Sequence, residues 1–265
     1  MIKKLFLPFI IILISFLLII NYLAYKSPIE AKLITQQKAY SVDNNNSLNI
    51  LIYANKKTAF QEKEAIEKTY LCNFDETKKL EISLNNIRAV NDYKYLKETY
   101  KEYMYTFSLP VIDNYFYIED AYLFIRLKNS KEMNFKLGSL DYYNNEPNLD
   151  ITELYGQKHA DFPTLKTINI RFNLTEDIFI EHVYLANNVF TYVGKTITND
   201  ELVTIDFPKL DKITDKLIIR IDYQISGALY TTTTPYFMFY ESIENPLIHS
   251  VLNNVYILDW GKKHL

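Results

Sequence analysis

The residues able to carry chemistry are few and widely spaced. The histidines are His159, His182, His249 and His264, and no two stand in an H-x-H or H-E-x-x-H arrangement. A metalloprotease site of that kind is therefore excluded. We expect His182, which falls inside a strand-like segment, to be a surface or strand-edge residue. His249 stands beside Ser250, but nothing in the sequence nominates a nucleophile for a Ser–His dyad.

Paired carboxylates are the catalytic groups of most glycosidases, which need two of them facing each other across a cleft. The sequence offers Glu119 with Asp120, Glu176 with Asp177, and Asp211 with Asp215. Adjacent residues in a strand point to opposite faces, and the second pair is typical of a turn. We therefore expect all three pairs to be solvated surface charge.

Aromatic residues are abundant, with 23 Tyr and 16 Phe against one Trp. Rings at the ends of strands can stack on sugars or anchor a protein partner. The candidates are Tyr142, Tyr143, Tyr230, residues 236–240 and Trp260. The alternative is that these rings fill sheet faces, where Tyr and Phe are favoured.

Other site classes are excluded by composition. The five glycines are too scattered for a phosphate-binding loop or a nucleophile elbow. The single cysteine, Cys72, excludes an internal disulfide and a cysteine-cluster metal site. With a net charge of −3 and no basic stripe, nucleic acid is not an expected partner. We expect no catalytic residue, no cofactor and no metal.

An apolar segment near the N-terminus gives the strongest single signal. Residues 5–23 carry no charge and follow Lys3 and Lys4; as a helix they would span ~28 Å, about one hydrocarbon core. A cleaved signal peptide is the alternative, but the run is long and no A-x-A site follows it. We expect a retained transmembrane helix that contacts membrane lipid. We place the rest of the chain outside the cytoplasm.

A short motif, I-E-x-x-Y-L, occurs at residues 66–71, 118–123 and 180–185. In a regular strand its Ile and Tyr point to one face, while Glu and Leu point to the other. We expect the second and third copies to be equivalent hairpins with a buried tyrosine, and the first copy to lie in a short helix over residues 58–70. The motif glutamates, Glu67, Glu119 and Glu181, could form a repeated ligand site, but an ordinary structural role is favoured.

The elements that would position these residues are mostly strands. Short runs of β-type sequence, rich in Ile and aromatic residues and alternating only in part, recur every 8–12 residues or so, which is typical of sandwiches and barrels. They cover residues 48–53, 80–90, 103–109, 115–127, 135–143, 167–174, 178–185, 189–193, 202–207, 217–225, 236–240 and 255–260.

The predicted fold is mainly β, with one N-terminal transmembrane helix followed by two tandem antiparallel β-sandwich (Ig-like) modules. The expected divisions are a membrane anchor (1–25), a stalk (26–46), a first module (47–145), a linker (146–163) and a second module with a C-terminal tail (164–265).

Two functions remain open. The first is a non-catalytic binding or scaffolding protein of the cell envelope, with a protein or glycan partner outside the cytoplasm, and possible service to a transport or secretion complex. The alternative is an anchored hydrolase acting on envelope glycans or peptides. The absence of a catalytic motif favours the first.

Overall fold

Alternating apolar and polar side chains build a first lobe from two facing sheets. The computed structural model describes residues 15–16, 30–144, 148–160, 163–185, 188–191, 196–214, 216–238 and 245–258. Sheet A has the order β19 (Asn253–Leu258), β1 (Ala31–Gln36), β3 (Leu48–Ala54), β7 (Glu98–Ser108) and β6 (Ser83–Tyr95). Sheet B has the order β2 (Lys38–Asp43), β9 (Glu132–Tyr143), β8 (Tyr115–Leu127), β4 (Ile66–Cys72) and β5 (Lys79–Glu81).

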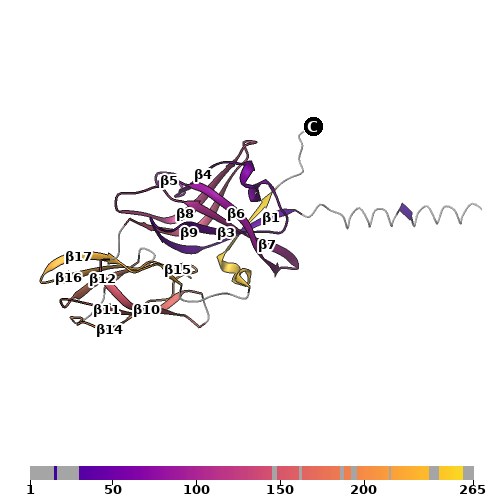
Figure 1. Ribbon diagram of the computed structural model, residues 1–265. Helices are drawn as coiled ribbons and strands as arrows, with labels where there is room; N and C mark the ends of the chain where they lie inside the picture. The colour runs from indigo at the N-terminus through magenta and orange to yellow at the C-terminus, as the bar shows by residue number, and fades with distance from the viewer. Residues whose placement is uncertain are drawn as a thin grey trace, which may run out of the picture.

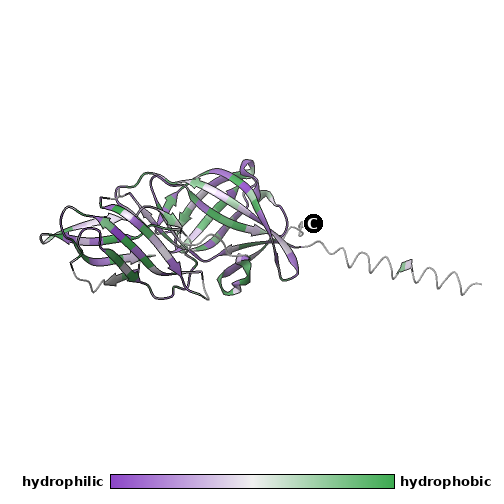
Figure 2. Ribbon diagram, turned by 60° about the horizontal axis from the view of Figure 1, so that its bottom comes forward, coloured by the Kyte–Doolittle hydropathy of each residue, from purple (hydrophilic) through white to green (hydrophobic). Residues whose placement is uncertain are grey.

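The first core lies between sheets A and B. Its fully buried side chains include Ile50, Tyr105 and Phe107 from sheet A, and Leu123 and Phe135 from sheet B. The colouring of Figure 2 shows the alternation of apolar and polar residues along the strands. Burying one face of each sheet in this way is the dominant stabilising term in such a lobe.

A second lobe repeats the arrangement with smaller sheets (Figure 1). Sheet C contains β10 (Asp150–Lys158), β11 (Leu165–Asn173) and β14 (Leu202–Asp206). Sheet D contains β13 (Asn188–Thr191), β12 (Phe179–Leu185), β16 (Arg220–Ile225) and β17 (Ala228–Thr233). Their core includes Ile170, Phe172, Val183, Leu217 and Ile221. A two-stranded pair, β15 (Lys216–Leu217) with β18 (Phe237–Met238), accompanies them. The expectation of a mainly β protein is confirmed.

The two lobes are joined along the outer edge of β2. Lys38 forms a parallel bridge with Ile213, whose backbone N–H donates to the carbonyl of Gln37 at 3.1 Å. The Ser41 hydroxyl donates to the carbonyl of Ile218 at 2.9 Å and accepts from its N–H at 3.1 Å. Ile213 and Ile218 of the second lobe thus lie against an edge strand, the part of a sheet most open to unwanted pairing.

Several expected boundaries are wrong. The expected stalk contains β1 and β2, and the expected linker contains β10. The expected tail of the second module returns to the first lobe, because β19 pairs with β1 from Ala31↔Leu258 to Gln36↔Asn253. The sheets are also not purely antiparallel, since β2 runs parallel to β9.

The helix expected over residues 58–70 is also wrong. Two short 3-10 turns, η1 (Ala59–Gln61) and η2 (Lys63–Ala65), are followed directly by β4. Thr58 and Gln61 form a capping box that starts the first turn. Phe60 then packs edge-on against Phe135, with ring centres 5.9 Å apart. Two further turns, η3 (Pro246–Ile248) and η4 (Ser250–Leu252), precede β19.

All three copies of I-E-x-x-Y-L lie in strands, and each contains a β-bulge. The ladder skips Glu67 in β4, Glu181 in β12, and both Glu119 and Asp120 in β8. An extra residue of this kind changes the face on which the following side chains point.

The bulge overturns the expected facing of the motif. Leu71, Leu123 and Leu185 are fully buried, as are Ile118 and Ile180. Tyr122 and Tyr184, expected to be largely buried, are only half-buried. Ile and Leu therefore share the core face, and the tyrosine lies on the other.

The expected membrane helix falls outside the described residues, apart from Ser15 and Phe16. Among the residues that are described, no helix is long and apolar enough to cross a membrane. The anchor over residues 5–23 stays a prediction.

Candidate functional site

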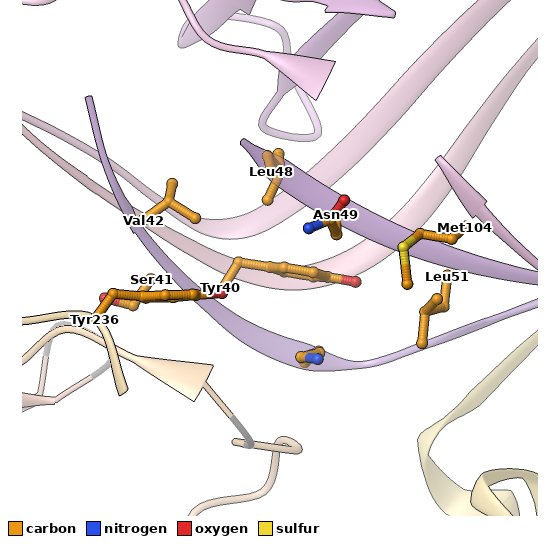
Figure 3. A pocket seen from close by; sticks show the side chains of 9 residues that line it. Tyr40, Ser41, Val42, Leu48, Asn49, Leu51, Met104 and Tyr236 are labelled. Carbon is orange, nitrogen blue, oxygen red and sulfur yellow. The ribbon is translucent and has the colours of Figure 1, made fainter. Parts of the chain in front are cut away.

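A small groove opens where the two lobes meet (Figure 3). Its volume is about 90 Å³. We call it the junction groove. Its lining includes Lys38 and Tyr40 of β2, Asn49 and Leu51 of β3, Met104 of β7, and Tyr236 of the second lobe. The Tyr40 ring lies along the groove and points toward Leu51 and Met104, while Tyr236 extends along the same wall (Figure 3).

The groove exists because one extended segment changes sheets. β1 ends at Gln36 in sheet A, and β2 begins at Lys38 in sheet B. β2 therefore diverges from β3, and the side chains of the two strands line the opening between them. The Lys38 ammonium lies 5.6 Å from the centre of the Tyr40 ring, within the range of a cation–π contact.

A buried polar cluster lies on the outer face of sheet A. Glu102 of β7 is opposite Tyr53 of β3 and is only 5% exposed. The Asn91 amide donates to Glu102 Oε2 at 3.1 Å, and the Tyr53 hydroxyl donates to Gln36 Oε1 at 3.4 Å. Hydrogen bonds of this kind allow polar groups to be buried at tolerable cost.

Burial controls the ionisation of this cluster. Desolvation raises the pKa of the Glu102 carboxyl, although hydrogen bonds from Tyr53 and Asn91 and the charge of Lys38 act in the opposite direction. Burial, followed by the negative charge of Glu102, raises the pKa of the Tyr53 hydroxyl well above its usual value. Burial thus disfavours the charged form of both groups, and their hydrogen bonds to Asn91 and Gln36 join them to neighbouring residues.

A second polar cluster connects the lobes. The Tyr115 hydroxyl donates to Asp141 Oδ1 at 2.7 Å, and Asp141 is 1% exposed. The Arg220 guanidinium of β16 lies 5.6 Å from the Tyr115 ring centre and 3.5 Å from that of Tyr184. Burial, and then the Asp141 carboxylate, raises the pKa of Tyr115. These two cation–π contacts connect sheet B of the first lobe to sheet D of the second.

The candidate histidines and acidic pairs do not converge. His159, His182 and His249 are half-buried at separate places, and His264 lies outside the described residues. Glu119 and Asp120 are exposed at the bulge of β8, where Asp120 pairs with Lys136 at 3.4 Å. Glu176, Asp177 and Asp211 are exposed, and Asp215 lies outside the described residues. In the described part of the chain no three His, Cys, Asp or Glu residues are grouped to hold a metal.

The aromatic candidates divide into three kinds. Tyr142 and Tyr143 are 1% exposed and fill sheet B, as the packing alternative predicts. Tyr230 is 45% exposed on β17 and stacks on Tyr223 at 5.7 Å. Tyr236 lines the junction groove, and Trp260 lies outside the described residues. Of the groove residues, only Tyr236 was a sequence candidate; the others carry no local signal, because they meet only through long-range packing.

The motif glutamates also lie apart. Glu67 and Glu119 are exposed, and Glu181 is half-buried against the side-chain amide of Gln224. The three belong to different strands, β4, β8 and β12, the last of which is in the other lobe. Their shared property is the bulge, so a structural role explains them.

No known protein family and no curated protein matches the chain. Among solved structures, tandem immunoglobulin domains of titin match with 7% identity and a TM-score of 0.21, covering 77% of this chain and 94% of theirs. The YadV chaperone matches with 8% identity and a TM-score of 0.24, covering 76% of this chain and 98% of its own.

A Bacteroides ovatus protein of a mixed-linkage glucan utilization locus, solved with a mixed-linkage heptasaccharide, matches with 11% identity and a TM-score of 0.21. The match covers 77% of this chain and 43% of the Bacteroides ovatus protein. With TM-scores this low, none of these likenesses bears on function, and the expected Ig-like topology stays a prediction.

Proposed function

We propose that the chain is a non-catalytic binding protein of the cell envelope. In this proposal residues 5–23 hold it in the membrane, its two β-lobes lie outside the cytoplasm, and the junction groove takes a glycan or protein partner. Service to a transport or secretion complex is a further part of the proposal.

The observation that carries the proposal is the composition of the junction groove. Its walls come from both lobes and combine two tyrosine rings, Tyr40 and Tyr236, with the Asn49 amide and the Lys38 ammonium. Aromatic faces with a few polar groups at fixed positions orient ligands in binding sites. At about 90 Å³ the junction groove would receive only a small part of the partner. Ser41 and Ile218 fix one lobe to the other beside the groove, so its walls are already in place before a partner binds.

Membrane attachment is tested by washing membranes with high salt and with carbonate. The proposal expects the chain to stay in the membrane fraction and expects protease added to intact spheroplasts to digest residues 30–258. Recovery of a shortened chain from the medium would contradict the retained anchor. Protection of the lobes until lysis would contradict their placement outside the cytoplasm.

Binding is tested with purified envelope glycans as the probe. Tyr236→Ala and Asn49→Ala should each weaken binding at least several-fold, whereas Tyr230→Ala should not, because that exposed tyrosine lies on β17 and outside the groove. Equal loss in all three variants, or loss in none, would contradict a site in the junction groove. Glycans that fail to bind, together with a protein captured through the same two residues, would favour a protein partner.

A further inference from the structure

We propose that the tip of the β6–β7 hairpin rests in the headgroup region of a phospholipid bilayer, beside the membrane anchor. The tip loop consists of residues 94–97. The inference rests on the proposed function, because it takes residues 5–23 as a tether, and it adds a second contact between the folded protein and the membrane.

The first argument is the chemistry of the turn. Tyr95 pairs with Glu98, so Leu96 and Lys97 form a two-residue connection, and both have positive φ, 46° and 67°. Such turns prefer Asn-Gly, since a side chain with Cβ is strained in the left-handed region. Leu96 is nevertheless held there with 77% of its surface exposed. Packing within the lobe does not bury this leucine, whereas insertion into a membrane would bury its side chain.

The second argument is position. Glu98 accepts an ion-paired hydrogen bond at 2.9 Å from Lys32, the second residue of β1. The tip loop therefore lies at the end of the lobe where the chain arrives from residues 5–23. The seven residues 24–30 between that stretch and β1 span at most ~25 Å when fully extended. In Figure 1 the β6–β7 hairpin points away from the second lobe, which leaves this end available to the membrane.

The third argument is charge and composition. Lys94 and Lys97 flank the exposed leucine, and Tyr95 packs against Tyr100 with ring centres 6.2 Å apart. Lysines near a bilayer are attracted to anionic headgroups, and tyrosine and leucine settle at the boundary with the acyl chains. The Asn245 amide, which donates to the Lys94 carbonyl at 2.9 Å, holds the base of the tip loop in place.

The experiment uses the full chain in vesicles of equal parts phosphatidylglycerol and phosphatidylcholine. An environment-sensitive fluorophore is attached to Leu96→Cys or, as the control, to Val111→Cys. Val111 is 83% exposed beyond the other end of β7, about 35 Å away along the strand. The native Cys72 is 1% exposed and burial raises its pKa, so the introduced thiol takes the label.

The expected result is a blue-shifted emission at position 96 that lipid-borne nitroxide quenches, with neither effect at position 111. A reporter at Lys97→Cys gives a second measurement, in which Leu96→Asn should reduce the quenching. Asn is favoured in a left-handed turn, so loss of folding would not explain that reduction.

The outcomes separate the two proposals. Equal emission and equal quenching at positions 96 and 111, in a chain that resists carbonate, would overturn this inference and leave the tether standing. A blue shift at position 96 without lipid quenching would assign the tip loop to a protein contact instead. A chain released by carbonate would overturn the tether and the inference together.

Discussion

Burial of the Glu102 carboxyl group beside Tyr53 makes its ionisation harder in the folded protein than in the unfolded chain. The pKa of Glu102 is raised by desolvation in the folded state. The contribution of Glu102 to stability is therefore greatest at a pH below the pKa that its carboxyl has in the unfolded chain. That contribution is lost as the pH rises through the pKa that the carboxyl has in the folded protein. Glu102→Gln has no charge to desolvate.

We expect the difference between the unfolding temperatures of Glu102→Gln and the natural chain to shift in favour of the variant as the pH rises from about 4 to about 8. Thermal unfolding across this range gives the comparison. Glu119→Gln, the same change at an exposed bulge, serves as the control. If the unfolding temperatures of the two variants depend on pH in the same way, the pKa of Glu102 is not raised by burial.

Gly138 permits a close approach between β2 and β9. Its φ is +119°, and a Cβ there would lie 2.3 Å from the Lys38 carbonyl oxygen and 2.6 Å from the Lys38 nitrogen. Gly138→Ala should therefore cost more than about 2 kcal/mol in unfolding free energy, since backbone must move. Gly227→Ala is the matched control, because its φ is +85° but nothing lies within 4 Å; it should cost only about 1 kcal/mol. Similar losses of unfolding free energy for the two variants in chemical denaturation would contradict a clash at Gly138.

At the scale of elements, the bulge decides which motif residue matters for stability. Leu123→Ala removes a fully buried side chain from the first core and should cost about 2–5 kcal/mol. Tyr122→Ala should cost clearly less, because this tyrosine lies on the other face and is half-buried. Glu119→Ala should stay within about 0.5 kcal/mol. Denaturant unfolding gives all three values. A larger loss of stability for Tyr122→Ala than for Leu123→Ala would contradict the bulge and favour the regular strand that the sequence predicts.

Strands were predictable from sequence where one face is apolar. Residues 115–127 are rich in aromatic and β-branched residues, and β8 spans Tyr115–Leu127. The strands β1 and β2 were not predictable, because much of what they bury is polar: Thr35, Gln36 and Ser41 are all at most 9% exposed. These side chains bond to Lys136, Pro246 and Ile218, 101 to 210 residues away. Partners that distant leave no trace in local composition.

At the scale of the whole molecule, two lobes are readable from the sequence, but the way they join is not. The prolines and polar residues of 144–163 mark the change of lobe, whereas the return of β19 to β1 pairs segments more than 200 residues apart. The junction groove depends on that assembly, since its residues come from β2, β3, β7 and the loop carrying Tyr236. Sequence periodicity reports the faces of single strands, and the groove is a property of several strands together.

The last prediction concerns the bond between the lobes. Ser41 is 3% exposed, and its hydroxyl satisfies both the N–H and the carbonyl of Ile218. Ser41→Ala leaves both groups buried without this partner, which should cost about 1–3 kcal/mol. Because the loss falls at the junction, calorimetry should show the two lobes unfolding further apart in temperature than in the natural chain.

Ser139, on the neighbouring strand β9, is the matched control. It is fully buried, but its hydroxyl has no hydrogen-bond partner among the residues that the structure describes. Ser139→Ala should therefore be neutral or stabilising, because removing an unsatisfied buried hydroxyl leaves nothing unpaired. If the two alanine variants unfold alike, the Ser41 bridge does not hold the lobes together. The rigidity of the junction groove would then depend on other contacts between the lobes, among them segment 213–214 and Arg220.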